Sequence, residues 1–272
     1  GAGRPSGWRG GENSPDLGSD VERPKSLVAC RGQGWATEGD RHDDSFFDLL
    51  RIERSRRGAV LLNLLNYFIE NLGLVLKLTL EHVQITVISV SVSTIIGVAI
   101  GIVITRYRKA ATAVIGVAGI IYTIPSLALF GMLIPFIGIG IKPALIALIL
   151  YSQLALIRNT FVGIIHIDPA IREAGQGMGM SRWQFLRMIE LPMALPVIMA
   201  GIRTAAVMNI GTATIAAYIG AGGLGWLIFR GIASVHTEQI VAGAVPVALL
   251  AIGVDQLFVL LERFLTPPGL RP

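Results

Sequence analysis

Side chains that commonly bind metals or act as nucleophiles are sparse in this chain of 272 residues. None of the four histidines lies at the spacing of a metal site, so we expect no metal and no cofactor; they are His42, His82, His166 and His236. The only cysteine is Cys30, which excludes an internal disulfide. The chain has no GxxxxGK[ST] loop, so we expect that it is not an enzyme and does not hydrolyse ATP itself.

The most informative residues form a loop over 168–192, with the sequence DPAIREAGQGMGMSRWQFLRMIELP. Asp168 can cap a first short helix that has Pro169 at its first position, where a missing N–H group costs nothing. Glycines at 175, 177 and 179 should break this helix.

A second short helix is predicted to follow Ser181, which can cap it while Gln184 completes a capping box. Leu191 and Pro192 should close it. The two helices carry apolar side chains of the kinds that are enriched in protein interfaces, namely Met178, Met180, Trp183, Phe185 and Met188. The loop is therefore a candidate docking surface; the alternative is a loop that only covers its own helices.

The surrounding composition predicts a membrane protein. Hydrophobic residues make up 53% of the chain and charged residues only 15%, whereas soluble domains have about 25% charged residues. Five apolar stretches are long enough to span a bilayer, which requires about 20 residues each: 83–104, 110–137, 143–163, 194–219 and 239–261. Pro125 and Pro135 should kink the second span, and Gly97 and Gly101 form a GxxxG spacing that permits close helix approach.

Residues 61–80 show helical spacing of apolar residues, interrupted by polar ones, and favour an interfacial amphipathic helix, with a sixth span as the alternative. Residues 1–60 are expected to be disordered or a non-native leader, because they are polar and because no methionine precedes Met132. Translation from a position near Val60 or Leu61 would fit this expectation. The transmembrane domain is then 61–265, followed by a tail over 266–272.

Basic residues predict the orientation, because cytoplasmic loops are enriched in lysine and arginine. They follow the first and fifth spans and cluster around the loop after the third; they are Arg106, Arg108, Lys109, Arg158, Arg172, Arg182, Arg187, Arg263 and Arg271. The 168–192 loop and the C-terminus should therefore face the cytoplasm.

The loop resembles the EAA loop of ABC importer permeases, whose pattern is Glu-Ala-Ala, three residues, Gly, nine residues and Ile-x-Leu-Pro. Matching residues are Glu173, Ala174, Gly179, Ile189, Leu191 and Pro192, whereas Gly175 replaces the second alanine and should loosen the first helix. The resemblance implies an all-α permease core like that of methionine importers. It also implies that the loop docks on a separate ATPase subunit, with Glu173 and Gly179 at the centre of the contact.

Further segments within 61–265 resemble the osmoprotectant branch of this family, which imports glycine betaine, choline, carnitine or proline. Examples are Thr123–Ala128, Gly201–Ala205 and Ile219–Gly225. The resemblance implies a multi-pass subunit of a bacterial or archaeal plasma (inner) membrane. Its expected partners are ABC ATPase subunits, an extracytoplasmic solute-binding protein and a second permease copy, the same or a similar one. A permease for methionine or another small solute is the alternative.

Polar and aromatic residues inside the spans are the candidates for the translocation pathway. They are Tyr122, Thr123, Pro125, Ser126, Asn209, Thr212 and Tyr218. The two tyrosines could hold a quaternary amine by cation–π attraction. Interhelical hydrogen bonding is the alternative for each polar residue. Mutual pairing or snorkelling is expected for Arg203 and Asp255, and an interfacial position for His82.

Three other interpretations compete with these assignments. The run Gly220–Gly225 fits GxGxxG, but nucleotide binding would need a βαβ unit, so we expect an outer turn that gates the exit or meets the binding protein. An ion-driven secondary transporter would need a carboxylate relay, for which only Asp255 and Glu81 come close. A membrane scaffold would explain the spans but not the 168–192 loop.

Overall fold

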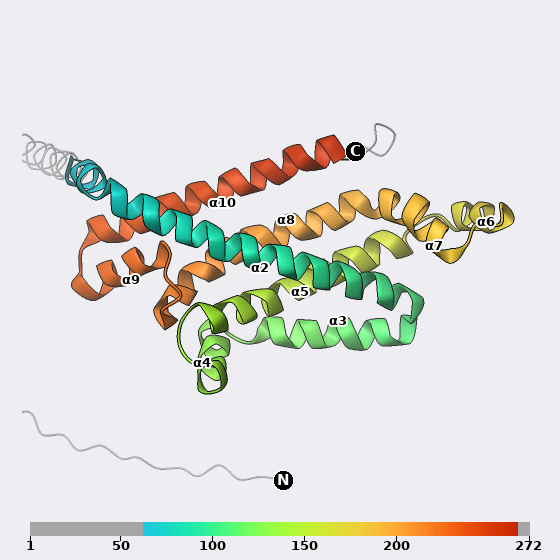
Figure 1. The fold of residues 1–272 in the computed structure, drawn as a ribbon, viewed down its shortest axis with the longest axis horizontal. Helices are drawn as coiled ribbons and strands as arrows, with labels where there is room; N and C mark the ends of the chain where they lie inside the picture. Colours follow the sequence, from blue (N-terminus) through green and yellow to red (C-terminus); the bar gives the residue numbers. More distant parts are fainter. Residues whose placement is uncertain (1–61, 266–272) are drawn as a thin grey trace, which may run out of the picture. The chain divides into compact units, whose positions relative to one another are not determined.

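The computed structural model describes residues 62–265, and this part of the chain consists of helices and short connections without a strand (Figure 1). Residues 62–70 are helical. The elements that follow are α2 (Leu72–Arg106), α3 (Arg108–Thr123), α4 (Ser126–Ile137), α5 (Ile141–Ile165), α6 (Pro169–Gly177), α7 (Arg182–Phe185), a π-helical segment (Leu186–Glu190), α8 (Leu191–Ala216), a 3₁₀ turn (Ala217–Ile219), α9 (Gly225–Ser234) and α10 (Thr237–Leu265). The predicted all-α membrane fold is confirmed.

Four helices are long and apolar enough to cross a membrane: Leu72–Arg106, Ile141–Ile165, Arg182–Ile219 and Thr237–Leu265. The helices α3 and α4 pass the same test as a pair, bent by 97°, so the described residues hold up to five spans. Pro125 explains the bend, because the residue before a proline is disfavoured in helical conformation and Ile124 is extended with ψ 127°. The predicted kink in the second span is thus a break.

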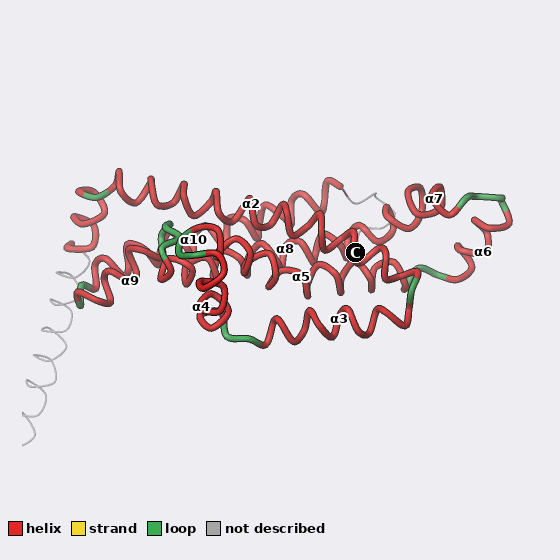
Figure 2. The backbone as a smooth tube through the Cα atoms, turned by 60° about the horizontal axis from the view of Figure 1, so that its bottom comes forward, coloured by secondary structure: helices red, strands yellow, loops and turns green. Residues whose placement is uncertain are grey.

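Three long helices, α2, α5 and α8, pack together as the centre of the fold (Figure 2). The predicted GxxxG approach lies between α2 and α5. A Cβ atom placed on Gly97 would stand 2.5 Å from the Cβ of Leu156, and one on Gly101 would stand 2.5 Å from the Cβ of Thr160. The backbones can therefore come this close only because both positions are glycine.

The first helical boundaries differ from those expected. The helix over 62–70 ends in a turn at Asn71, and residues 72–80 form the first part of α2 rather than a separate interfacial helix. Val75 and Leu78 are buried there against Leu224 and Leu227, so packing within the protein holds this segment. At 1.5 Å per residue, the 35 residues of α2 extend over about 50 Å, more than a bilayer core of about 30 Å.

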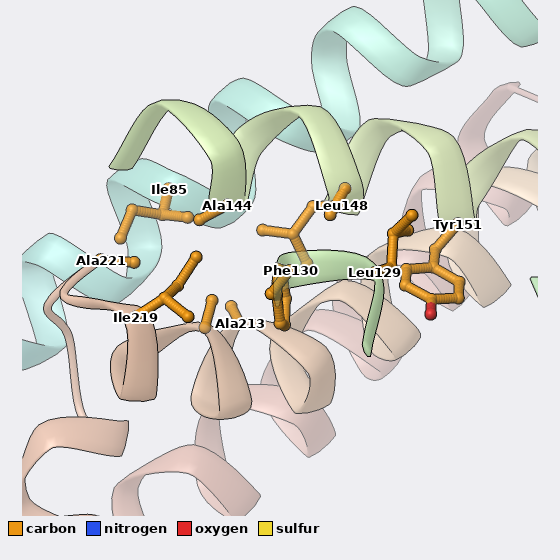
Figure 3. Packing of buried hydrophobic residues seen from close by; sticks show 11 residues of the cluster. Ile85, Leu129, Phe130, Ala144, Leu148, Tyr151, Ala213, Ile219 and Ala221 are labelled. Carbon is orange, nitrogen blue, oxygen red and sulfur yellow. The ribbon is translucent and has the colours of Figure 1, made fainter. Parts of the chain in front are cut away.

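A second apolar cluster fixes the bent pair against the long helices (Figure 3). Phe130 and Leu148 are fully buried in it, and Ile85 of α2 and Ile219 after α8 complete it. This cluster holds α4 across the end of α5 and α8. The segments with the predicted cytoplasmic basic residues, at the α2–α3 junction and around α6 and α7, lie together at the opposite end of the helices (Figure 1).

Candidate functional site

The predicted docking loop forms a compact pair of short helices at that opposite end of the molecule (Figure 1). Asp168 Oδ1 accepts a hydrogen bond from the Ala170 backbone N–H at 2.8 Å, with Pro169 at the first helical position, as predicted. The helix α6 ends after Gly177, and Gly179 then turns the chain with φ +74°, which glycine adopts without strain.

The helix α7 begins with the predicted capping box. Ser181 Oγ accepts a bond from the Gln184 backbone N–H at 3.3 Å, and Gln184 Oε1 accepts one from the Ser181 N–H at 2.8 Å. Two donors that a helix start leaves without partners are therefore satisfied by adjacent side chains. The local sequence is enough to build this turn.

Gly175 does not loosen α6, contrary to the expectation. The helix runs through Gly175, and the glycine is buried against Phe185. Phe185 itself is only 7% exposed, so it joins the two short helices and is not part of the displayed surface, also contrary to expectation. The residue that departs from the EAA pattern thus makes room for an aromatic ring.

We expect Gly175→Ala to weaken ATPase docking about fivefold to thirtyfold. A Cβ at this position would stand 2.6 Å from two ring atoms of Phe185, so α6 and α7 would have to separate at a cost of about 1–2 kcal/mol. Quantitative co-purification of the ATPase would measure the effect. Gly177→Ala is the matched control, because no atom lies within 4 Å of its Cβ. Equal retention of the ATPase by both variants would contradict this account.

Leu191 and Pro192 were expected to close the second helix, but they do not. The chain passes from α7 through the π-helical segment into α8 without a break. Pro192 lies in the first turn of α8, and the altered hydrogen bonding of a π segment accommodates a residue without an N–H group. The helix that contains the fourth span is therefore continuous with the docking loop and begins at Arg182 rather than at residue 194.

Glu190 is a site residue that sequence reasoning missed. Its side chain is 1% exposed and lies 2.9 Å from Arg106 and 3.7 Å from Arg172. Arg106 ends α2, Arg172 lies in α6, and Glu190 ends the π segment, so one carboxylate connects three elements. The only sequence signal was a charged residue between the apolar residues Ile189 and Leu191.

Three of the five side chains predicted for the displayed surface are exposed, whereas Met180 is half-buried and Phe185 is buried. Glu173 and Ala174 are exposed on α6, and the large exposed side chains beside them are Met178, Trp183 and Met188. Ile189, Leu191 and Pro192 are half-buried and belong to the base of the loop. A rigid base with an exposed acidic and apolar surface is suited to bind another protein.

Four of the predicted pathway residues meet at the break between α3 and α4. Tyr122 and Thr123 end α3, Pro125 precedes α4 and Ser126 begins it. Tyr122 contacts Met208 of α8 through its hydroxyl at 3.8 Å and lies edge-on to Tyr151 of α5. Thr123 donates to the Ile120 carbonyl of its own helix.

The structure does not bring the other candidates to this place. Asn209 is buried and forms hydrogen bonds with Ser89 and Ser152, which is the interhelical bonding considered as its alternative. Thr212 donates to the Met208 carbonyl within α8. Tyr218 is exposed and packs on Phe229.

Two polar residues expected at boundaries are held by partners. Arg203 and Asp255 form a two-bond ion pair at 2.5 and 2.7 Å, which confirms the expected pairing. His82 is fully buried between helices and lies 3.0 Å from the Ile210 carbonyl, while its predicted position at the outer membrane boundary stays a prediction. Beside it, Gly223 donates its N–H to Glu81 at 3.2 Å in a glycine turn that no strand precedes within residues 62–265.

Comparison with known proteins places this architecture in a family. Residues 84–267 match the model of the binding-protein-dependent transport system inner membrane component. The osmoprotectant import permease protein OsmW of Salmonella typhimurium is 47% identical over 212 residues, which are 76% of this chain and 99% of that protein. The glycine betaine/carnitine/choline transport system permease protein OpuCB of Bacillus subtilis is 45% identical over 201 residues, 74% of this chain and 93% of that protein.

Solved structures agree on the fold. An inward-facing form of the MetNI methionine ABC transporter aligns with a TM-score of 0.66 at 22% identity, over 72% of this chain and 98% of that one. An amino acid ABC transporter crystallised with histidines aligns with a TM-score of 0.60 at 18% identity, over 72% and 96% of the two chains. The predicted methionine-importer-like core is confirmed, and the chain belongs to the family of binding-protein-dependent transport system inner membrane components.

Proposed function

We propose that the chain is the permease subunit of an ATP-driven importer of osmoprotectants such as glycine betaine, choline, carnitine or proline. ATP hydrolysis takes place in separate ATPase subunits that dock on the 168–192 loop, and a solute-binding protein delivers the solute from outside. A second permease copy completes the pathway. The relatives named for osmoprotectants support the solute class, because they match nearly their whole lengths.

The observation that carries the coupling role is the construction of the loop. Glu173, Met178 and Trp183 are exposed on its outer surface, while Glu190 ties its interior to α2. The loop also continues directly into α8. A push on the loop by an ATPase therefore moves two membrane helices, and switching between inward-open and outward-open states requires such a connection.

Uptake of radiolabelled glycine betaine tests the function. Cells that lack their own osmoprotectant uptake, but express this chain with its ATPase and binding protein, should accumulate the label after an increase in external osmolarity. Glu173→Lys should reduce the rate at least tenfold, because it reverses a charge at the centre of the docking surface. If the cells accumulated labelled methionine but neither labelled glycine betaine nor labelled choline, the alternative solute class would be favoured and the proposed one rejected.

A further inference from the structure

A groove beside the helix break carries the chemistry of a solute site. It is an open groove between α3, α5 and α8 with a volume of about 480 Å³, which is in the range of small-molecule pockets. Its lining residues are Tyr122, Tyr151, Leu154, Ala155, Arg158, Asn159, Val162, Thr204 and Met208. Only Tyr122 among them was a candidate from the sequence.

We propose that this groove binds those proposed solutes that are small zwitterions with a methylated ammonium, such as glycine betaine and carnitine, with the ammonium against Tyr122 and Tyr151 and the carboxylate against Arg158. The inference rests on the proposed function and adds a binding site and the chemical class of its ligand. It assigns Tyr151 and Arg158 to solute contact.

The aromatic end of the groove has the geometry of a cation site. The rings of Tyr122 and Tyr151 have centroids 6.2 Å apart and planes at 81°, so they form two walls of a corner. A methylated ammonium in this corner can contact both rings through its polarised methyl groups. Such contacts are worth about 0.5–2 kcal/mol, the upper end where water is excluded.

Arg158 supplies the complementary charge. It lies on α5, seven residues before the helix ends at Ile165, its side chain is exposed, and no carboxylate of residues 62–265 lies within 4.0 Å of it. Arg158 is the only charged residue that lines the groove, so its guanidinium is available to an anionic ligand there. The solute carboxylate is that ligand, and a guanidinium can bind it through two parallel hydrogen bonds.

The two ends of the groove are within reach of one small molecule. Tyr151 and Arg158 are seven residues apart on α5 and therefore lie on the same face, two turns apart. Their backbones are about 10 Å apart along the helix at 1.5 Å per residue, and the long arginine side chain can cover part of this separation. The remaining separation suits a solute with a few bonds between its charges.

The groove is also joined to the break between α3 and α4. The Tyr151 hydroxyl donates to the carbonyl of Ile124, at the break between α3 and α4. This bond satisfies a backbone group that the break would otherwise leave without a partner in the membrane. Any change in the angle between α3 and α4 therefore changes the aromatic corner, which links solute contact to alternating access.

Equilibrium dialysis of the full chain in nanodiscs tests the site with glycine betaine and tetramethylammonium as probes. Wild type should bind glycine betaine about tenfold more tightly than tetramethylammonium, because only the former has a carboxylate. Arg158→Gln should abolish this ratio while leaving tetramethylammonium binding within about twofold. Tyr122→Leu should weaken both probes about fivefold, whereas Tyr122→Phe should retain both.

Arg263→Gln is the matched control, because this arginine is exposed at the end of α10, away from the groove. Wild type that binds neither probe would overturn the proposed site, as would Arg158→Gln that keeps the ratio. Loss of both probes in Arg158→Gln would also overturn it, because it would show a structural role only. The uptake assay tests the proposed function separately. If cells take up glycine betaine but Arg158→Gln keeps the wild-type ratio between the two probes, the site is rejected and the proposed function stands.

Discussion

Glu190→Gln is expected to reduce solute uptake about tenfold while the amount of protein in the membrane stays within about twofold of wild type. The substitution keeps the shape of the side chain but removes the charge that faces Arg106 and Arg172. Removing one partner of a fully buried pair costs about 3–5 kcal/mol. The two arginines are 39% and 37% exposed, so water compensates for part of this loss and about 1–2 kcal/mol is the expected cost.

The functional loss should exceed the loss of stability, because Glu190, Arg106 and Arg172 form an ion cluster that joins α6 to α2. Without it, movement of the docking loop is no longer passed to the first span. The measurement is uptake of labelled glycine betaine together with the ATPase activity of the purified complex. ATP hydrolysis should continue while uptake falls, which is the signature of uncoupling.

Glu238→Gln is the control for this experiment, since Glu238 lies in the first turn of α10, away from the ion cluster. It should leave uptake unchanged. Wild-type uptake by Glu190→Gln would show that the cluster does not transmit the motion.

Gly97→Val should lower the thermal unfolding midpoint of the purified chain by about 5–10 °C. The new Cβ would stand 2.5 Å from the Cβ of Leu156, an atom that cannot move without its backbone. Overpacking of this kind costs about 1–3 kcal/mol, and each kcal/mol lowers the midpoint of a chain of this size by about 2–4 °C. The helices α2 and α5 would separate at the centre of the fold.

Gly253→Val provides the comparison, because a Cβ on Gly253 has no atom within 4 Å. It should change the midpoint by less than about 2 °C. Similar losses in the two variants would mean that valine is disfavoured in these helices generally, and that close approach at Gly97 is not the cause.

Local sequence predicted the parts of the site that depend on neighbours in the chain. The caps at Asp168 and Ser181 follow from side chains two or three residues away from their partners, and the break at Pro125 follows from the steric effect of proline on Ile124. The GxxxG approach was also correct, because two glycines four residues apart lie on one face of α2 and leave room for the neighbouring helix.

The errors involve partners that are distant in sequence. Arg106 and Glu190 are separated by 84 residues, so no local pattern could reveal their ion pair. Gly175 looked like a defect of α6 because the ring that fills its place belongs to α7. Likewise, residues 72–80 looked interfacial because the apolar residues that bury Val75 and Leu78 are near residue 224.

The fold class was accessible because bilayer length and charge distribution constrain it strongly. Predictions for residues 1–60 and 266–272 lie outside the described residues and stay predictions. So does the expected contact of the Gly220–Gly225 turn with a binding protein.

The central claim is that an ATPase docks on the 168–192 loop, and co-purification tests it most directly. The tagged chain should be purified from its native membranes as wild type and as Glu173→Lys, with Glu238→Lys as the charge-matched control. The account predicts that a protein with a GxxxxGK[ST] loop and ATPase activity co-purifies with wild type and with the control, and is lost from Glu173→Lys together with uptake. An ATPase that stays bound to Glu173→Lys while uptake continues would contradict the claim, as would a wild-type complex without any such ATPase.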